Sequence, residues 1–247
     1  MFKDYKLEIL YQDEYLVAIN KPSGLLVHKS MIDRHEIYFA MKILRDQIDQ
    51  WVYPVHRLDK PTSGVLLFAL DKHTAKLMSE QFLAHTIQKT YIAVVRGYTQ
   101  EKGVLDYALS VKLDKIADKR SSEIKEAQEA VTEYERLAIV EVPHAVGRYD
   151  KSRYSLVKLM PKTGRKHQLR RHMKHLSHHM LGDTKYGRGE HNKMIRKEYG
   201  CHRLLLHATT LQITHPYTDE SLIIKADVDE IFNSIIESFS WQNSYNF

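Results

Sequence analysis

The stretch His56-Arg57-Leu58-Asp59-Lys60-Pro61-Thr62-Ser63-Gly64, followed at once by Val65-Leu66-Leu67-Phe68-Ala69-Leu70, decides how the centre of this chain folds. Pro61 fixes its own φ and disfavours a helical conformation at Lys60. Thr62-Ser63-Gly64 has the composition of a turn, and the apolar run after it is typical of a buried strand. Asp59 is therefore expected in a tight polar loop anchored to the core. Such an aspartate is more often a turn former or a cap, but a carboxylate held this way can also be a nucleophile or a general base.

Length and composition indicate an ordinary globular protein with a basic surface. The 247 residues are 43% hydrophobic and 28% charged, enough for one substantial core. A net charge of +6 fits a nucleic-acid partner without requiring one, and the cations concentrate between Lys158 and Arg203. The single cysteine, Cys201, excludes an intramolecular disulfide and a cysteine-rich zinc site. With no signal-peptide pattern and no apolar run of ~20 residues, a cytoplasmic protein without membrane association is expected.

Periodicity predicts a mixture of helices and strands without regular alternation. This pattern favours an α+β fold with a mixed, largely antiparallel sheet, in one domain covering residues 1–247. Residues 104–160 are expected to be largely β, interrupted by the charge-rich segment 114–129. Asp71 is the expected N-cap of the second helix. The expected strands are 7–10, 15–20, 65–70, 88–97, 152–160, 202–214 and 221–225, and the expected helices are 37–50, 72–85, 165–178 and 228–238.

A group of histidines offers a metal-binding alternative. His172, His175, His178 and His179 lie close together, and His175 and His179 have the i,i+4 spacing that can bind zinc on a helix. The segment lacks the glutamate of a metalloprotease motif, and the surrounding lysines and arginines would repel a cation. We therefore expect no metal and no other cofactor.

Three segments carry a resemblance to a known family. Residues 56–64 resemble the His-Arg-Leu-Asp-x-x-Thr-Ser-Gly signature of the RluA family of pseudouridine synthases. Residues 88–97 are similar to its Tyr-x-Ala-x-Val-x-Gly strand, and residues 161–172 to its Thr-Gly-Arg-x-His-Gln-x-Arg-x-His motif. The resemblance runs from about Leu7 to Ala226. It implies the pseudouridine synthase fold, with helices and loops around a central RNA-binding cleft. Many members carry an N-terminal S4-type domain, which we do not expect here.

The resemblance also implies roles for individual residues. Asp59 corresponds to the catalytic aspartate, Tyr91 to the tyrosine that packs on the target uracil and is favoured to remove the C5 proton, and Arg170 to the arginine that pairs with the aspartate. An arginine beside a buried carboxylate keeps it ionised, and its fork orients the carboxylate better than lysine would. The expected RNA contacts are His56, Arg57, Arg165, Lys166, Arg171 and Lys174. The expected structural positions are Lys21, Pro22, Gly24, Thr62 and Gly64, and the segments Gly182-Asp183 and Arg203 to Ala208 are interpreted as scaffold.

The substrate expected from the resemblance is tRNA. Segments 113–119, 147–149, 162–172 and 175–178 resemble the branch of the family that converts uridine 65 of certain tRNAs. One departure is His178-His179, where family members usually have proline after the first histidine. Two alternatives stay open: the same chemistry on a ribosomal RNA uridine, and a noncatalytic RNA-binding module. No obligate protein partner is implied.

Overall fold

A computed structural model describes residues 5–29, 36–110 and 126–244 of the chain. The charge-rich segment expected at 114–129 lies outside the described residues except for 126–129, and so do residues 113–119. Within the described ranges the fold is α+β, as the sequence predicts.

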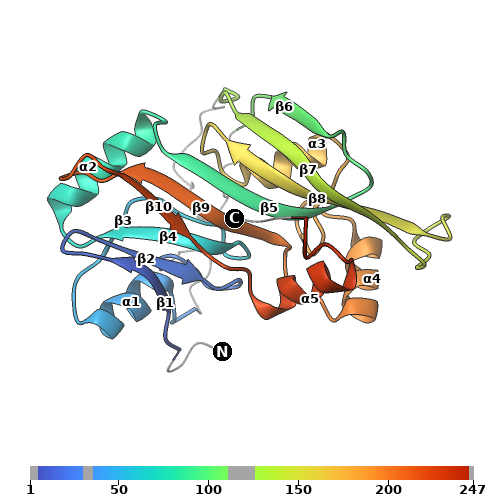
Figure 1. Cartoon of the computed structure of the whole chain (residues 1–247), viewed down its shortest axis with the longest axis horizontal. Helices are drawn as coiled ribbons and strands as arrows, with labels where there is room; N and C mark the ends of the chain where they lie inside the picture. The colour runs from blue at the N-terminus through green and yellow to red at the C-terminus, as the bar shows by residue number, and fades with distance from the viewer. Residues whose placement is uncertain (1–4, 30–35, 111–125, 245–247) are drawn as a thin grey trace.

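A ten-stranded sheet runs through the whole molecule (Figure 1). Its strands follow the order β1-β2-β4-β9-β5-β8-β7-β6, with β10 beside β9 and β3 beside β4. All strand pairs are antiparallel except β4 with β9. The strands are β1 (Glu8–Gln12), β2 (Leu16–Lys21), β3 (Tyr53–Pro54), β4 (Ser63–Ala69), β5 (Gln88–Arg96), β6 (Lys102–Asp106), β7 (Val131–Val142), β8 (Ser152–Pro161), β9 (Leu206–Thr214) and β10 (Ser221–Lys225).

Helices cover both faces of the sheet, which explains why its central strands are apolar on both sides. Helix α1 packs on one face of β2 and β4 and helix α2 on the other. Helix α3 packs on one face of β5 and β8, with α4 and α5 on the opposite face. The helices are α1 (Ala40–Ile48), α2 (Lys72–Leu83), α3 (Gln168–His175), α4 (Gly189–Tyr199) and α5 (Glu230–Ser238). Every residue of β4 is buried, as expected from its unbroken apolar run.

Two helices differ from the sequence-based expectation. Helix α3 begins at Gln168, not Arg165, because His167 adopts a left-handed conformation with a φ of 55°. The Gln168 side chain instead accepts hydrogen bonds from the Thr163 hydroxyl and the Arg165 backbone N–H. Helix α4 was not predicted because the glycines before it suggested only turns. Gly189 is nevertheless its first residue, and Gly200 ends it with a φ of 65°.

The single parallel contact in the sheet depends on Gly64. Ser63 lies opposite His207 and Gly64 opposite Ala208. Gly64 has a φ of 109°, and a Cβ added there would lie 2.1 Å from the Ala208 carbonyl oxygen. Only glycine fits this approach, which agrees with the structural role predicted for Gly64. The contact brings the end of the Asp59 loop against a strand from the last fifth of the chain.

Candidate active site

One pocket gathers the three predicted catalytic residues. It has a volume of about 370 Å³ and lies between residues 55–62, the end of α2, the start of β5 and residues 161–170. Its lining includes Asp59, Tyr91, Arg170, His56, His167 and Lys89. Residues more than 100 positions apart in sequence therefore meet at one cavity, of a size that suits a small organic group.

Arg170 is the central charge of the pocket. Its Nη1 donates to Asp59 Oδ2 over 3.0 Å, while Nε and Nη2 donate to the two carboxylate oxygens of Asp183, each over 2.8 Å. The expectation that the guanidinium fork holds Asp59 is therefore wrong in detail, because the fork holds Asp183 and a single bond reaches Asp59. Burial opposes the charged form of Arg170, but the hydrogen bonds and charges of Asp183 and Asp59 outweigh it and raise its pKa. Asp183, interpreted from sequence as scaffold, fixes the guanidinium.

Asp183 is itself held ionised in a buried position. Its side chain is 1% exposed. Burial raises its pKa, but the bonds from Arg170 and the backbone N–H groups of Lys185 and Tyr186 lower it by more. Asp183 lies 13 residues from Arg170 in sequence, so no local spacing could have identified the pair.

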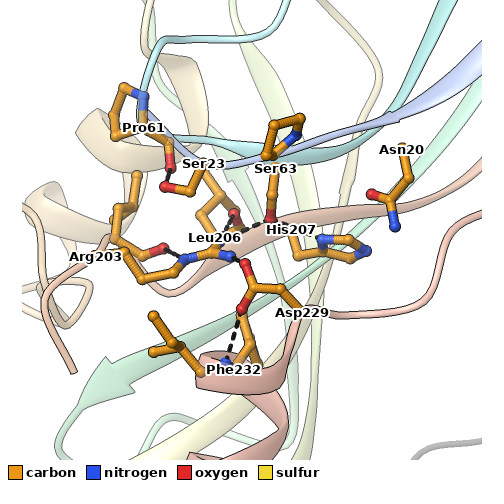
Figure 2. A network of polar contacts seen from close by, with 12 residues as sticks. Asn20, Ser23, Pro61, Ser63, Arg203, Leu206, His207, Asp229 and Phe232 are labelled. Atoms are coloured by element: carbon orange, nitrogen blue, oxygen red, sulfur yellow. Dashed lines mark hydrogen bonds and ion pairs between the residues drawn. The ribbon is translucent and has the colours of Figure 1, made fainter. Parts of the chain in front are cut away.

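The loop that carries Asp59 is braced at successive carbonyl groups. The Asp59 carbonyl accepts from the Thr62 N–H over 3.0 Å. The next carbonyl, of Lys60, accepts from the Gly24 N–H over 2.8 Å and from the Lys21 ammonium over 3.2 Å. The Pro61 carbonyl accepts from the Ser23 hydroxyl over 2.7 Å (Figure 2). Lys21, Gly24 and Thr62, for which a structural role is expected, thus hold the backbone of the loop through hydrogen bonds.

Lys21 is fully buried and has carbonyl partners in place of a carboxylate. Its ammonium also donates to the carbonyls of Pro22 and Leu25, over 2.9 and 2.8 Å. Burial, with a smaller contribution from Arg203, lowers its pKa to about 7, against an opposing effect of Asp59. The lysine thus connects three loop carbonyls beneath the active-site aspartate.

A second polar network lies under the end of the loop (Figure 2). Arg203 Nη2 donates to Ser63 Oγ over 2.7 Å, and Ser63 Oγ lies 2.8 Å from His207 Nδ1. Since His207 Nε2 donates to the Ala226 carbonyl, its Nδ1 accepts from the serine hydroxyl. Burial lowers the pKa of His207 to about 4, which keeps the ring neutral. Arg203 also pairs with Asp229, which caps α5 by accepting from the Phe232 N–H.

Tyr91 lies on β5 and lines the pocket, as predicted. Burial, and to a smaller extent the Asp59 charge, raise the pKa of its phenol well above the ordinary value of 10. The phenol therefore keeps its proton at neutral pH while Asp59 is charged.

His56, which is expected to contact RNA, lines the pocket and also makes contacts within the protein. Its Nε2 accepts from the Leu67 backbone N–H over 3.0 Å, and its ring stacks on Phe82 with centroids 4.9 Å apart. Burial, and secondarily Lys89, lower its pKa to about 3. His56 is thus a neutral residue that ties the loop to β4. Arg57 beside it is exposed at the rim of the pocket, where an RNA contact is feasible.

Two pocket residues were missed in the sequence. His167 Nε2 lies 3.8 Å from Asp59 Oδ1, and its Nδ1 lies 2.9 Å from the Tyr186 hydroxyl. Burial lowers its pKa to about 4 despite the nearby Asp59 charge. Lys89 brings a second cation into the lining, and burial lowers its pKa. Both residues lie inside the motifs quoted above, next to the positions that drew attention.

The remaining predicted RNA contacts lie on the surface around α3. Arg165 Nε donates to the Glu129 carbonyl, and Arg171 Nη2 donates to the Ser110 hydroxyl. Lys166 and Lys174 have exposed side chains. The histidines considered as metal ligands have separate partners: His172 bonds Thr132, His178 the Arg96 carbonyl, and His179 the Tyr186 carbonyl. Within the described ranges no group of three or more metal-ligating side chains has the geometry to hold a metal ion.

Comparisons with known proteins agree with this site. The sequence matches the family described as RNA pseudouridylate synthase over residues 15–175. It is 57% identical over 236 residues to a protein named tRNA pseudouridine synthase C from Vibrio parahaemolyticus, with 96% of each chain covered. It is 56% identical over 237 residues to a protein of the same name from Haemophilus influenzae, covering 96% of this chain and 99% of that one.

Solved structures share the fold over nearly the whole chain. Human RNA Pseudouridylate Synthase Domain Containing 4 superposes with a TM-score of 0.69 at 28% identity, covering 94% of this chain and 93% of that one. Human RNA Pseudouridylate Synthase Domain Containing 1 superposes with a TM-score of 0.70 at 22% identity and covers 95% of both chains. Across the residues that the structure describes, no helix has the length and apolar character needed to cross a bilayer.

Proposed function

This chain belongs to the RNA pseudouridylate synthase family, and on that premise we propose that it isomerises uridine 65 of tRNA to pseudouridine. The tRNA substrate is supported by the relatives named tRNA pseudouridine synthase C, which are 53–57% identical. Position 65 is supported by the motif resemblance outside the catalytic segments. The continuous sheet supports one catalytic domain, and a tRNA substrate together with a single cysteine supports a cytoplasmic enzyme.

The observation that carries the proposal is the meeting of Asp59, Arg170 and Tyr91 in one pocket. In the proposed reaction the N1–C1′ bond of uridine breaks, the uracil rotates, and a bond forms between C5 and C1′. The C5 hydrogen leaves as a proton and N1 gains one, so the atoms of substrate and product are the same. Asp59 is the carboxylate that reacts with the nucleotide, and Arg170 orients it through one charged hydrogen bond. A stem-paired uridine must be extruded from its helix to reach the pocket.

Tyr91 is assigned to stacking and to removal of the C5 proton. Burial is the larger obstacle to its ionisation, but part of the raised pKa comes from the negative charge of Asp59. A covalent bond between Asp59 and the nucleotide would neutralise that charge for as long as the bond lasts, and the bond must break again, restoring the carboxylate, before the product leaves.

RNA binding is assigned to the cations around the pocket. Arg57 lies at the rim, and Arg165, Lys166, Arg171 and Lys174 surround α3. These side chains suit backbone phosphates, which fix the position of an RNA without reading its sequence.

The decisive experiment is tritium release from unmodified tRNA labelled at uridine C5. We expect release by the wild type and none by Asp59→Ala, with the product mapping to position 65. Release from ribosomal RNA but not tRNA would change the substrate and keep the chemistry. If neither RNA released tritium while both still bound, the chain would be a binding module and the proposed function would be wrong.

A further inference from the structure

Arg96, at the end of β5 and outside the pocket, is held by a buried relay. Its Nε donates to His191 Nε2 over 3.1 Å, and His191 Nδ1 lies 2.8 Å from the hydroxyl of Tyr154, which is fully buried. Because Nε2 accepts, the neutral ring carries its proton on Nδ1. In the part of the chain that the structure describes, no carboxylate forms an ion pair with Arg96. The guanidinium of Arg96 is therefore held in position through its Nε edge, and its charge is not paired with a described carboxylate.

Two further cations lie near Arg96. Burial is the main cause of the lowered pKa of His179, and the charges of Arg188, Arg96 and Lys174 all contribute to it. The fold places them there as well. Arg188 is the N-cap residue of α4, the helix that carries the His191 bonded to Arg96. Lys174 lies in the last turn of α3, shortly before His178, whose Nδ1 lies 2.8 Å from the Arg96 carbonyl oxygen. Arg188 and Lys174 have exposed side chains, and neither has an ion pair with a described carboxylate. The charge of Glu190 also reaches His191, and Glu141 and Asp150 line the adjoining cavity, but the cations of this region outnumber these three acids. An excess of like charge of this kind favours binding of an anion.

A groove opens beside these residues. A cavity of about 670 Å³ lies between the end of β5, the β7–β8 connection and the residues that follow α3. Arg96, Arg153, Ser177 and His178 line it. Two acids lie in its wall: Glu141, which pairs with Lys151 and Arg153 over 2.9 and 2.8 Å, and the exposed Asp150. The groove thus offers positive charge and polar groups to an anion.

The groove and the active-site pocket follow each other along β5 and along α3. Tyr91 in the pocket and Arg96 in the groove belong to the same strand, about 17 Å apart at ~3.3 Å per residue. Gln168, at the first turn of α3, lines the pocket, and Leu176, at its C-cap, lines the groove. A nucleotide in the pocket therefore cannot fill the groove, whereas the backbone of the same folded RNA can reach both.

We propose that Arg96, Arg188 and Lys174 form a second anchoring site, which binds backbone phosphates of the substrate RNA away from the target nucleotide. This site rests on the proposed function for the identity of the RNA, and it extends the contact predicted for Lys174 to two arginines that the sequence did not single out. Arginine forks suit the paired oxygens of a phosphate. An arginine whose side chain is already held in position loses less conformational freedom when it binds a phosphate.

The test compares steady-state kinetics of Arg96→Gln, Arg188→Gln and the double variant on full-length tRNA. We expect the KM of the double variant to rise about tenfold with kcat unchanged, and the slope of log affinity against log salt to flatten by about one for each phosphate that the variant no longer binds. On a short RNA holding the target uridine and its nearest neighbours, both constants should match the wild type. An unchanged KM and salt slope on tRNA, or an equal loss on the short RNA, would overturn the proposal.

Arg45→Gln on α1 is the matched control, because that arginine is also half-exposed but pairs with Asp46 over 2.8 Å. Arg96→Lys keeps the charge and removes the fork, so its KM should fall between those of the wild type and Arg96→Gln. Arg188 is exposed, so its variant stays informative even if Arg96→Gln folds poorly. If the wild type does not modify tRNA, the proposed function is wrong, but this result does not test the anchoring site. The anchoring site is then judged by tRNA binding to Asp59→Ala with and without the arginine changes.

Discussion

The guanidinium of Arg170 is fixed by Asp183 through two parallel hydrogen bonds of 2.8 Å, and only its third edge reaches Asp59. The active-site carboxylate therefore shares a cation whose position is set elsewhere. This arrangement gives Asp59 one oriented hydrogen bond and leaves most of its lone pairs available to a substrate. Two variants test the ion pairs that Arg170 makes with Asp183 and with Asp59.

Arg170→Lys should lower kcat by about 100-fold or more, because an ammonium cannot bond both carboxylates in the same geometry. Asp183→Asn should have a similar effect although it does not contact the pocket, since the fork of Arg170 would lose its anchor. Single-turnover rates at saturating enzyme measure both. Full activity in Asp183→Asn would contradict the positioning role of Asp183.

Tyr91→Phe should retain RNA affinity and lose turnover by about 100-fold, within the range ascribed to general base catalysis. The ring still stacks, but no group remains at that position to take the C5 proton. Tritium release and filter binding on the same tRNA separate the two effects. A near-normal release rate would exclude the hydroxyl as the base.

Gly64→Ala should destabilise the fold by roughly 3 kcal/mol or more, because the new Cβ meets the Ala208 backbone and the φ is left-handed. Gly189→Ala is the control, since an added Cβ there meets nothing within 4 Å. Urea unfolding of the two variants should differ clearly. Equal stabilities would show that β4 and β9 can separate without penalty.

Acid should weaken the network under the Asp59 loop. The pKa of His207 is lowered to about 4 by burial, whereas an unfolded histidine titrates near 6.5. Between these values the unfolded state binds more protons, so the contribution of His207 is complete above pH ~6.5 and disappears as the pH falls towards 4. His207→Gln removes this titration while keeping a donor and an acceptor. Its unfolding free energy should therefore depend less on pH in that window than the wild type's, as measured by urea unfolding across the range.

Asp229→Asn should lower kcat severalfold while leaving α5 folded, because asparagine is a good N-cap but cannot pair with Arg203. Removing the charged bond should cost on the order of 1 to 3 kcal/mol in stability. Circular dichroism measures whether α5 stays folded, and single-turnover rates measure whether the Asp59 loop keeps its active geometry. Loss of helix signal with normal rates would place the role of Asp229 in capping alone.

Much of this arrangement could be predicted from the sequence where the signal is local. The apolar run of β4 is unbroken because both faces are covered, and Asp71 caps α2 by accepting from the N–H groups of His73 and Thr74. The motifs also singled out Asp59, Tyr91 and Arg170, which meet in one pocket. Local signals did not predict α4, because its first residue, Gly189, is more typical of a turn than of a helix.

What could not be predicted depends on contacts between distant residues. The partner of the Arg170 fork is Asp183, because the chain turns back after α3, and no periodicity records that return. His56 lines the pocket, but the sequence does not show that its ring nitrogen also accepts the strand N–H of Leu67. In both cases the role follows from a buried polar group that requires a partner.

The order of synthesis decides when the contacts around the Asp59 loop can form. Two of them join early and late parts of the chain: the parallel contact at Gly64 and the network from Ser63 through Arg203 to Asp229. A ribosome delivers Asp59 early, together with the braces from Lys21, Ser23 and Gly24, but the partners of Ser63 and Gly64 come from the last fifth of the chain. At about 5 to 20 residues per second, the nascent chain would spend on the order of ten seconds or more without these later contacts. The enzyme should thus become active only once translation is complete, and a truncated product should be inert towards the cell's tRNA.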